Sequence, residues 1–521
     1  MKLKPNTLAL LLIILVTLVY FLPGLLSPRD FWVEDEARYG EILREMVHFN
    51  QWVVPHLNDH FYPDKPPVFF WLAALVSIIT GKITPFSGLL ITWFTTLGAV
   101  LVTWSFAKTL WNERAAFLTA MIFVSTFLVI GMAQIVRMDM MLTWFSMWAV
   151  YCFYLWYTKE QKKYIYLFYV FAAMAVLGKG PFGFTFPWFT AIIFLILEKE
   201  WKKLFKFVVH PGLILSVLIA LSWMILAWFT GNKDFVLTII NEQLLGRAVN
   251  SFSHKEPLWF YLAVLPFVTL PWFPFVPRAL KRWGTGFKLL LIYFISGFVT
   301  ISVVSGKLFI YLLPLVPPIA MIVGKLIDEL LTDKGPAKAW RIESVIAVLL
   351  TFGIFIAIAF AAPHFPITDL LNVAPLAWIF IPLTMVGLYF AWTRRVKSTF
   401  VVLVLGMYLF SAYMFQAVMV QINPYFSGRA IGNEISQFVR EGNKISQFRV
   451  RRGILNFYAE TIIPELGIDD VKGYFSGPDK LLILKESEYN KQGELLNRTQ
   501  VLSHYEIANE KYVIIGNKNV R

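Results

Sequence analysis

Long apolar runs dominate the hydrophobic pattern of this 521-residue chain and recur along most of its length. Runs of about 17–25 apolar residues are long enough to cross a bilayer as helices. The pattern therefore predicts an α-helical polytopic membrane protein with about thirteen spans. The expected spans are residues 8–26, 89–106, 115–133, 142–157, 164–177, 182–197, 211–229, 258–276, 289–304, 309–323, 345–361, 377–392 and 400–420.

A further apolar segment, residues 68–79, is too short to cross a bilayer comfortably. When it is excluded, the Lys- and Arg-rich loops all fall on one side of the membrane, together with Lys2 and Lys4. Counting it as a span would invert every later loop and break the positive-inside rule. We therefore expect residues 68–79 to lie in the outer interface, beside an amphipathic helix at 34–47.

This layout places the N-terminus in the cytoplasm and the first loop, residues 28–88, outside. The first apolar run lacks a small-residue cleavage site, so we expect it to stay as an anchor. After residue 420 the chain becomes polar, with strand-like "KLLILKE" and "KYVIIGN" and helix-like "GRAIGNEISQFVREG". We predict a transmembrane domain at 1–422 and a small external α/β domain at 423–521.

Composition narrows the function classes. The chain is 58% hydrophobic and only 15% charged, and its net charge of +14 is concentrated in the short loops between spans. The positive-inside rule accounts for that charge, so it does not indicate nucleic-acid binding. The single cysteine, Cys152, lies inside an apolar run, which excludes a disulfide framework and a thiolate metal site.

Unusual ionisable residues gather at the external ends of several spans. Taken singly, each has an ordinary interpretation, such as a solvated ion pair, a lysine reaching the interface, a loop histidine or an interfacial aromatic residue. Glu41 in particular is expected at a solvated helix position. The recurrence of acids and bases on one face favours a functional site. The candidates are Asp35, Glu36, Arg38, Asp64, Lys65, Arg137, Asp139, Lys179, Arg247, His254, Lys307 and Tyr311.

These residue types suggest two tasks in one external pocket. Lys and Arg side chains can hold the phosphate of an anionic lipid and offset the charge that develops on a leaving phosphate. Carboxylates can activate an acceptor nucleophile, and Asp35 and Asp139 are also candidates for holding a divalent metal ion. The residues alone therefore indicate an external-face enzyme that uses a lipid-phosphate-linked donor.

The first external loop adds a resemblance. "EDEARYGEILREM" followed by "QWVVPHLNDHFYPDKPPVFFWL" resembles bacterial membrane glycosyltransferases of the C superfamily, in particular the aminoarabinose transferases of lipid A and their protein-mannosyltransferase-like relatives. The likeness continues through "RMDMMLTWF", "LGKGPFGF" and "GKLFIYLLPLVPPIA". It implies an inverting enzyme of the bacterial inner membrane, with its active site and C-terminal domain on the periplasmic side.

The resemblance also implies roles for individual residues. Asp35 and Asp139 match the catalytic carboxylate positions, and Lys65 the expected contact to the donor phosphate. Arg38, Arg247 and Tyr311 correspond to residues that line the phosphate site, with the remaining candidates in supporting roles. At Asp64 the chain departs from the Glu common among aminoarabinose transferases, which leaves the substrate open.

We therefore expect an enzyme that takes a sugar, such as aminoarabinose, from an undecaprenyl phosphate carrier. The expected acceptor is lipid A or another glycan or lipid, and a Ser or Thr hydroxyl of a protein is the alternative. A lipid-linked sugar flippase is the alternative from another class. Transporters place charges near the bilayer midplane and often show internal repeats. In this sequence the charges lie at external span ends and no repeat is apparent, which disfavours a flippase. The pattern requires no cofactor, and the divalent metal ion considered above is the one candidate.

Overall fold

The structure is a computed structural model that describes residues 5–33, 35–241, 256–281, 284–304, 306–332, 338–361, 372–477, 479–492 and 499–517. The chain divides into two compact units. The helical unit comprises Met1–Ser27, Pro63–Phe69 and Leu89–Val418, and the mixed unit comprises Pro28–Tyr62, Phe70–Gly88 and Met419–Arg521.

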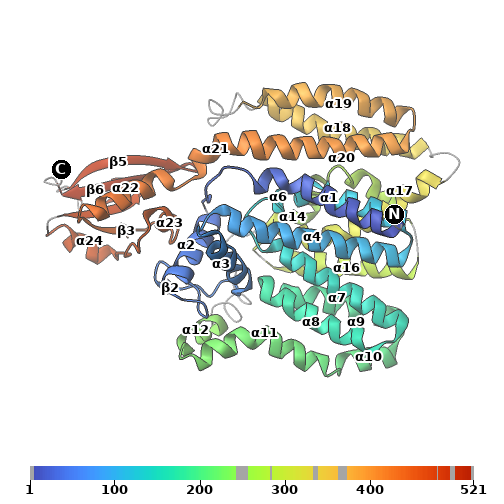
Figure 1. The fold of residues 1–521 in the computed structure, drawn as a ribbon, viewed down its shortest axis with the longest axis horizontal. Helices are drawn as coiled ribbons and strands as arrows, with labels where there is room; N and C mark the ends of the chain where they lie inside the picture. Colours follow the sequence, from blue (N-terminus) through green and yellow to red (C-terminus); the bar gives the residue numbers. More distant parts are fainter. Residues whose placement is uncertain are drawn as a thin grey trace. The chain divides into compact units, whose positions relative to one another are not determined.

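The helical unit is built almost wholly from helices (Figure 1). Its helical segments are α1 (Pro5–Leu25), α4 (Pro85–Leu110), α5 (Glu113–Val124), α6 (Phe127–Met132), α7 (Asp139–Lys159), α8 (Lys162–Lys179), α9 (Phe182–Leu197), α10 (Trp201–Val208), α11 (Gly212–Phe229), α12 (Lys233–Thr238), α14 (Phe260–Val268), η2 (Phe273–Phe275), α15 (Val276–Ala279), α16 (Thr285–Val303), η3 (Phe309–Leu315), α17 (Val316–Thr332), α18 (Lys338–Ala361), α19 (Ala374–Trp392), α20 (Val396–Tyr413) and η6 (Met414–Val418).

Fewer helices of the structure meet the length and composition of a membrane span than the thirteen that the sequence predicts. In the described part of the chain, eight helices are long and apolar enough to cross a membrane, and a bent pair of helices brings the number to nine. The polytopic helical fold is confirmed, whereas the count of thirteen stays a prediction. Residues 68–79 form α3 (Val68–Thr80), an apolar helix shorter than a full span.

Two expected spans are interrupted. The helix expected at 115–133 ends at Val124, because the hydroxyls of Ser125 and Thr126 donate to carbonyls one turn earlier, at 2.6 and 2.8 Å. The helix expected at 258–276 bends by 108° between α14 and the segment that starts at Phe273. Four prolines between residues 266 and 277 remove helix-forming amides there.

Helices α7 and α8 form a hairpin that positions part of the candidate site. A left-handed Glu160 (φ 55°) ends α7, and α8 begins two residues later. Aromatic side chains of the two helices pack together, with the Phe153 and Phe168 ring centroids 6.3 Å apart. Because the helices run antiparallel, the start of α7 and the end of α8 lie at the same end of the hairpin (Figure 1).

The mixed unit joins the first loop to the C-terminal part of the chain. Besides most of α3, its elements are α2 (Asp35–His48), β1 (His56–Leu57), β2 (His60–Phe61), α21 (Met419–Phe426), α22 (Arg429–Arg440), β3 (Lys444–Phe448), α23 (Asn456–Ala459), α24 (Ile468–Tyr474), β4 (Lys480–Lys485), α25 (Glu486–Lys491), β5 (Thr499–Ile507) and β6 (Glu510–Asn517).

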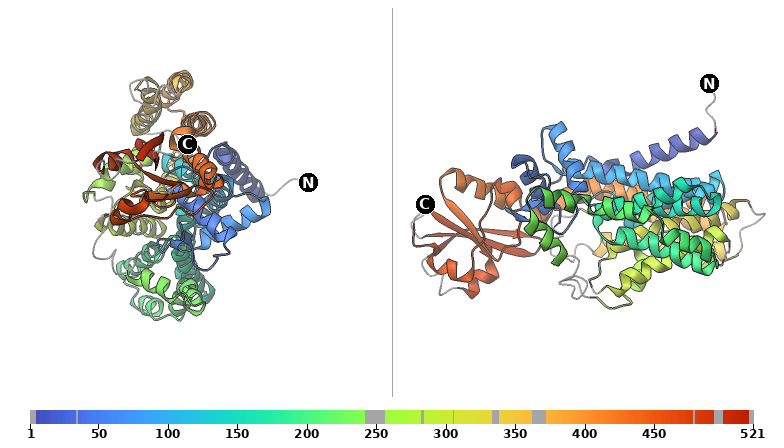
Figure 2. Two further views of the ribbon diagram at one scale, coloured as in Figure 1. Left: turned by 90° about the vertical axis from the view of Figure 1, so that its left-hand side faces the viewer. Right: turned by 90° about the horizontal axis from the view of Figure 1, so that it is seen from below.

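A four-stranded sheet with the order β3-β4-β6-β5 forms the core of the C-terminal part. Strands β3 and β4 are parallel, and the other two pairs are antiparallel. Alternate residues of "KLLILK" enter two separate apolar clusters, Leu481 and Ile483 on one face and Leu482 and Leu484 on the other. Helices cover both faces (Figure 2), which explains why this strand is apolar throughout rather than alternating.

Candidate functional site

Asp139 lies at the centre of a charged cluster in the helical unit. It is the first residue of α7 and is only 2% exposed. Its Oδ2 accepts a hydrogen bond from Arg137 Nε at 3.2 Å, and its Oδ1 accepts one from Lys179 Nζ. The carboxylate at a helix N-terminus is also favoured by the helix dipole. Two cations thus pair with one buried carboxylate.

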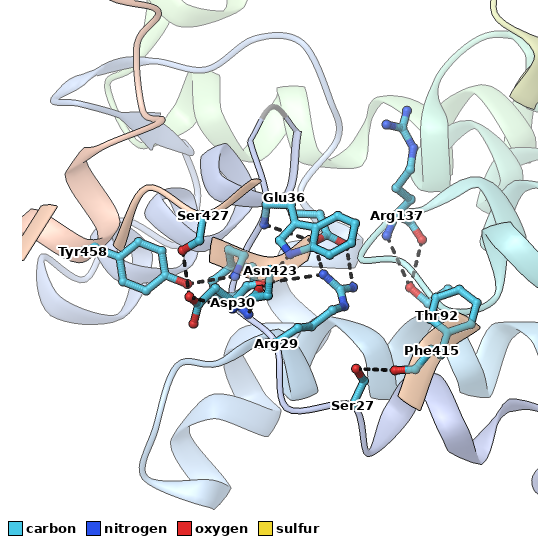
Figure 3. A network of polar contacts seen from close by, with 12 residues as sticks. Ser27, Arg29, Asp30, Glu36, Thr92, Arg137, Phe415, Asn423, Ser427 and Tyr458 are labelled. Carbon is cyan, nitrogen blue, oxygen red and sulfur yellow. Dashed lines mark hydrogen bonds and ion pairs between the residues drawn. The ribbon is translucent and has the colours of Figure 1, made fainter. Parts of the chain in front are cut away.

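Tyr311 completes this cluster. The ring of Tyr311, in η3, lies 5.0 Å from Lys179 Nζ, and Lys179 is the last residue of α8. The backbone of Arg137 is held in turn by Thr92 of α4, whose hydroxyl donates to the Arg137 carbonyl at 3.0 Å (Figure 3). The structure therefore brings four sequence-predicted residues together from three separate segments of the chain.

The remaining candidates of the helical unit are placed differently. Lys307 is buried, and its Nζ donates to the Glu256 carbonyl at 2.9 Å, so its role in the described structure is to hold backbone. Asp64 and Lys65 lie half-buried in the turn that precedes α3. Arg247 and His254 lie outside the described residues.

Asp35 lies in the first turn of α2, in the mixed unit. Its side chain is 29% exposed, and Arg38 Nη1 lies 3.4 Å from its Oδ1. The guanidinium of Arg38 also packs over the Tyr62 ring, 5.5 Å from the centroid. A carboxylate that is partly exposed and held by a neighbouring cation is suited to meet a substrate from solvent.

Glu36, the next residue, has a different environment. It is buried, and its Oε1 accepts from Arg29 Nη2 at 2.8 Å, while Oε2 contacts Arg29 Nη1 and the Trp32 amide (Figure 3). The Trp32 amide lies just before α2, so the Glu36 carboxylate caps a free backbone donor at the start of the helix. The side chain of Glu36 therefore fixes the start of α2.

The expectation that Glu41 is solvated is wrong. Glu41 is 0% exposed, and its two oxygens accept from Arg44 at 2.7 and 2.8 Å. The amphipathic pattern predicted one buried face, but ten of the 14 residues of α2 are buried. A buried carboxylate is tolerated because the bidentate guanidinium satisfies it.

Asp30 is a charged residue whose long-range polar contacts the sequence analysis missed. Its Oδ2 accepts from Ser427 Oγ at 2.7 Å and from Asn423 Nδ2 at 3.2 Å (Figure 3). Arg429 pairs with its Oδ1 at 2.5 Å. All three partners lie about 400 positions later in the chain. The only local signal was the charged pair of Arg29 and Asp30 next to the acidic stretch.

The carboxylates in the described structure do not fit a metal site. Among the residues that the structure describes, no group of three or more His, Cys, Asp or Glu side chains could hold a metal ion. Both oxygens of Asp139 already accept from cations, and a divalent ion there would have to displace Lys179 or Arg137. The donor set thus favours an ion-paired carboxylate over a metal ligand.

Comparison with known proteins agrees with this picture. The family of dolichyl-phosphate-mannose-protein mannosyltransferases matches residues 64–228. An undecaprenyl phosphate-alpha-4-amino-4-deoxy-L-arabinose arabinosyl transferase from Yersinia enterocolitica is 32% identical over 373 residues, which cover 69% of this chain and 66% of the relative. The chain belongs to this superfamily of membrane glycosyltransferases. The resemblance to these glycosyltransferases that the sequence suggested is confirmed.

Other relatives support membership in the superfamily and its fold. The transferase of the same name from Shewanella sediminis is 29% identical over 65% of this chain and 63% of its own length, so more than a third of that relative lies outside the match. The structure of ArnT from Cupriavidus metallidurans, bound to undecaprenyl phosphate, superimposes with a TM-score of 0.80 over 98% of both chains at 18% identity. This fold match extends through the C-terminal part of the chain.

Proposed function

We propose that this multi-pass membrane protein is an inverting glycosyltransferase. It moves a sugar, with aminoarabinose as the leading candidate, from undecaprenyl phosphate to lipid A or another glycan or lipid. The observation that carries the proposal is the 32% identity, over 69% of the chain, to a transferase named for that donor. Because the basic loops lie on one side of the predicted layout, the reaction is assigned to the periplasmic face of the bacterial inner membrane.

The cation cluster around Asp139 supports a phosphate-binding role. Arg137 and Lys179 both pair with Asp139, which places a guanidinium and an ammonium, two groups that bind phosphate, beside each other. The Lys179 ammonium next to the Tyr311 ring would be held in place when a phosphate approaches. Together with Lys65 and Arg247, these groups would offset the charge that develops on the departing phosphate.

In the transfer step, an acceptor oxygen forms a bond to the anomeric carbon while the bond from that carbon to the phosphate oxygen breaks. The polyprenyl phosphate leaves with the bonding electrons, and attack from the opposite side inverts the anomeric centre. Positive charge builds on the sugar as the bond breaks. Asp35, a partly exposed carboxylate, is assigned to stabilise that charge and to orient the acceptor.

Acceptor chemistry decides how much Asp35 must contribute. A lipid A phosphate is already anionic and needs no proton removed, whereas a hydroxyl needs a base as attack proceeds. The match of residues 64–228 to the protein mannosyltransferase family favours a protein hydroxyl as the second candidate acceptor. In that case the hydroxyl proton passes to the Asp35 carboxylate.

The test is mass spectrometry of lipid A and lipid-linked glycans from a deletion strain complemented with wild type, Asp35→Ala or Lys65→Ala. We expect the wild type to restore the sugar-modified product. Each variant should lower the amount of that product at least about 100-fold. Immunoblots of membranes should show equal amounts of all three proteins. A full level of transfer by either variant would contradict the assigned roles, and an unchanged glycan profile on deletion would contradict the function.

A further inference from the structure

The helix that carries Asp35 is not held by its own loop alone. Helix α2 has only 14 residues and few apolar positions, and an isolated helix of this length is marginal in water. Within the mixed unit, a short stretch of the C-terminal part, residues 453–463, contacts the chain at both ends of α2. We call this stretch the clamp segment.

The first attachment lies just before α2. The Phe31 amide donates to the Tyr458 hydroxyl at 2.8 Å, four residues before Asp35 (Figure 3). The Phe31 ring is fully buried and packs edge-to-face on Phe457, with ring centroids 4.9 Å apart. Burial and the nearby Asp30 carboxylate raise the pKa of Tyr458, so the phenol stays protonated at physiological pH.

The second attachment lies beyond the other end of α2. The Glu45 carboxyl group accepts from the amides of Asn58 and Asp59 at 2.5 and 3.1 Å, which ties α2 to the turn of the β1–β2 hairpin. Asn58 is 2% exposed and bonds to both backbone groups of Ile463 at 2.8 Å. The Asn456 amide also donates to Asn58 Oδ1, at 2.6 Å.

Close packing accompanies these hydrogen bonds. Gly453 adopts a φ of +81°, and a Cβ at this position would lie 2.3 Å from Leu57 Cδ1. Only glycine allows the backbone to approach β1 so closely in this conformation. The clamp segment thus has a conformational requirement, a buried amide pair and a buried tyrosine, all directed at the loop that carries α2.

We propose that the clamp segment positions α2, and with it Asp35, and that Tyr458 and Asn456 are the positioning residues. The inference rests on the proposed transferase function. It gives the C-terminal part of the chain a role in catalysis without direct contact to the substrate. Displacements of about 1 Å in a reacting group can lower turnover about 100-fold, so loss of a clamp contact should reduce kcat.

The test uses the full-length protein in lipid nanodiscs and the variant Tyr458→Phe, which removes only the hydroxyl. Its matched control is Tyr474→Phe, because the Tyr474 hydroxyl bonds the Lys444 and Leu481 carbonyls at 3.1 Å within the C-terminal sheet region. We expect Tyr458→Phe to lower kcat about tenfold or more with the donor KM unchanged. Tyr474→Phe should leave both parameters at the wild-type level.

Hydrogen exchange provides a readout that does not depend on turnover. In Tyr458→Phe and in Asn456→Ala, amides of residues 31–48 should exchange faster, while those of β4 and β6 keep their protection. Wild-type kcat together with wild-type exchange in Tyr458→Phe would overturn the proposal. Failure of the proposed function would give a different result. The wild type would then show no sugar transfer, while the exchange measurement would still report whether the clamp segment holds α2.

Discussion

At the scale of single residues, the environments of neighbouring carboxylates separate their roles. Asp35 is partly exposed beside Arg38, whereas Glu36 is buried against Arg29 and caps a backbone amide. Asp139 is buried between two cations. These acids therefore differ in exposure and in their partners, and residue type alone did not predict those differences.

The ion pairs of Asp139 give a prediction for a double-mutant cycle. Breaking a buried ion pair costs about 3–5 kcal/mol, because the remaining charge loses its partner. Lys179→Gln and Asp139→Asn should each lower the thermal unfolding midpoint, and the double variant should lose less than the sum of the two single losses. Sugar transfer should stay low in all three. Additive losses of the unfolding midpoint would show that the two side chains do not interact.

The ion pairs of Asp139 also give a prediction about metal ions. Because Lys179 and Arg137 already occupy both oxygens of Asp139, we expect turnover to be unchanged after chelation with EDTA and dialysis. A loss of turnover that Mg²⁺ or Zn²⁺ restores would show that a metal ion acts in the reaction.

At the scale of elements, α2 is attached to the β1–β2 hairpin, because Glu45 accepts hydrogen bonds from both backbone amides of the turn. Burial and the neighbouring Glu41 raise the pKa of Glu45 to about 8 from an ordinary value of 4.5. Arg44 of the same helix and Asp59 of the turn are the other charged groups near it. The attachment is therefore sensitive to pH.

The sign of this sensitivity can be worked out. Between about pH 4.5 and 8 the folded protein holds a proton on Glu45 that the unfolded chain releases, so the free energy of unfolding falls as pH rises. We expect a higher thermal unfolding midpoint at pH 6 than at pH 8.5. Glu45→Gln should remove this difference. An equal pH dependence in wild type and variant would assign it to other groups.

At the scale of the whole molecule, the membrane layout can be tested by labelling introduced cysteines. Eight or nine of the described helices meet the length and composition of a span, and the charge pattern favours thirteen. The chain's one native cysteine, Cys152, is buried, so introduced cysteines can be labelled against a low background. Lys162 and Glu510 are exposed positions in the two units.

Labelling Lys162→Cys and Glu510→Cys with an impermeant maleimide on intact spheroplasts tests the thirteen-span layout. We expect Glu510→Cys to react from outside, and Lys162→Cys to react only after the membrane is opened. Reaction of both cysteines from the same side would contradict the layout.

Local patterns in the sequence determined much of this protein. Apolar run length fixed the helical membrane fold, and the strands "KLLILKE" and "KYVIIGN" and the helix "GRAIGNEISQFVREG" appear as β4, β6 and α22. The cluster of Asp139, Arg137 and Lys179 was also foreseen, since these residues lie at span ends on one face. The length of an apolar run and the period of hydrophobic residues are local properties, so they can be read from the sequence.

The tertiary structure alone decided which carboxylates are buried and what holds α2. Glu36, Glu41 and Glu45 share one helix and one residue type, yet each has different partners. Asn456 and Tyr458 reach the first loop from about 400 residues away. Such contacts depend on how distant segments pack, and no local pattern of charge or hydrophobicity records that packing.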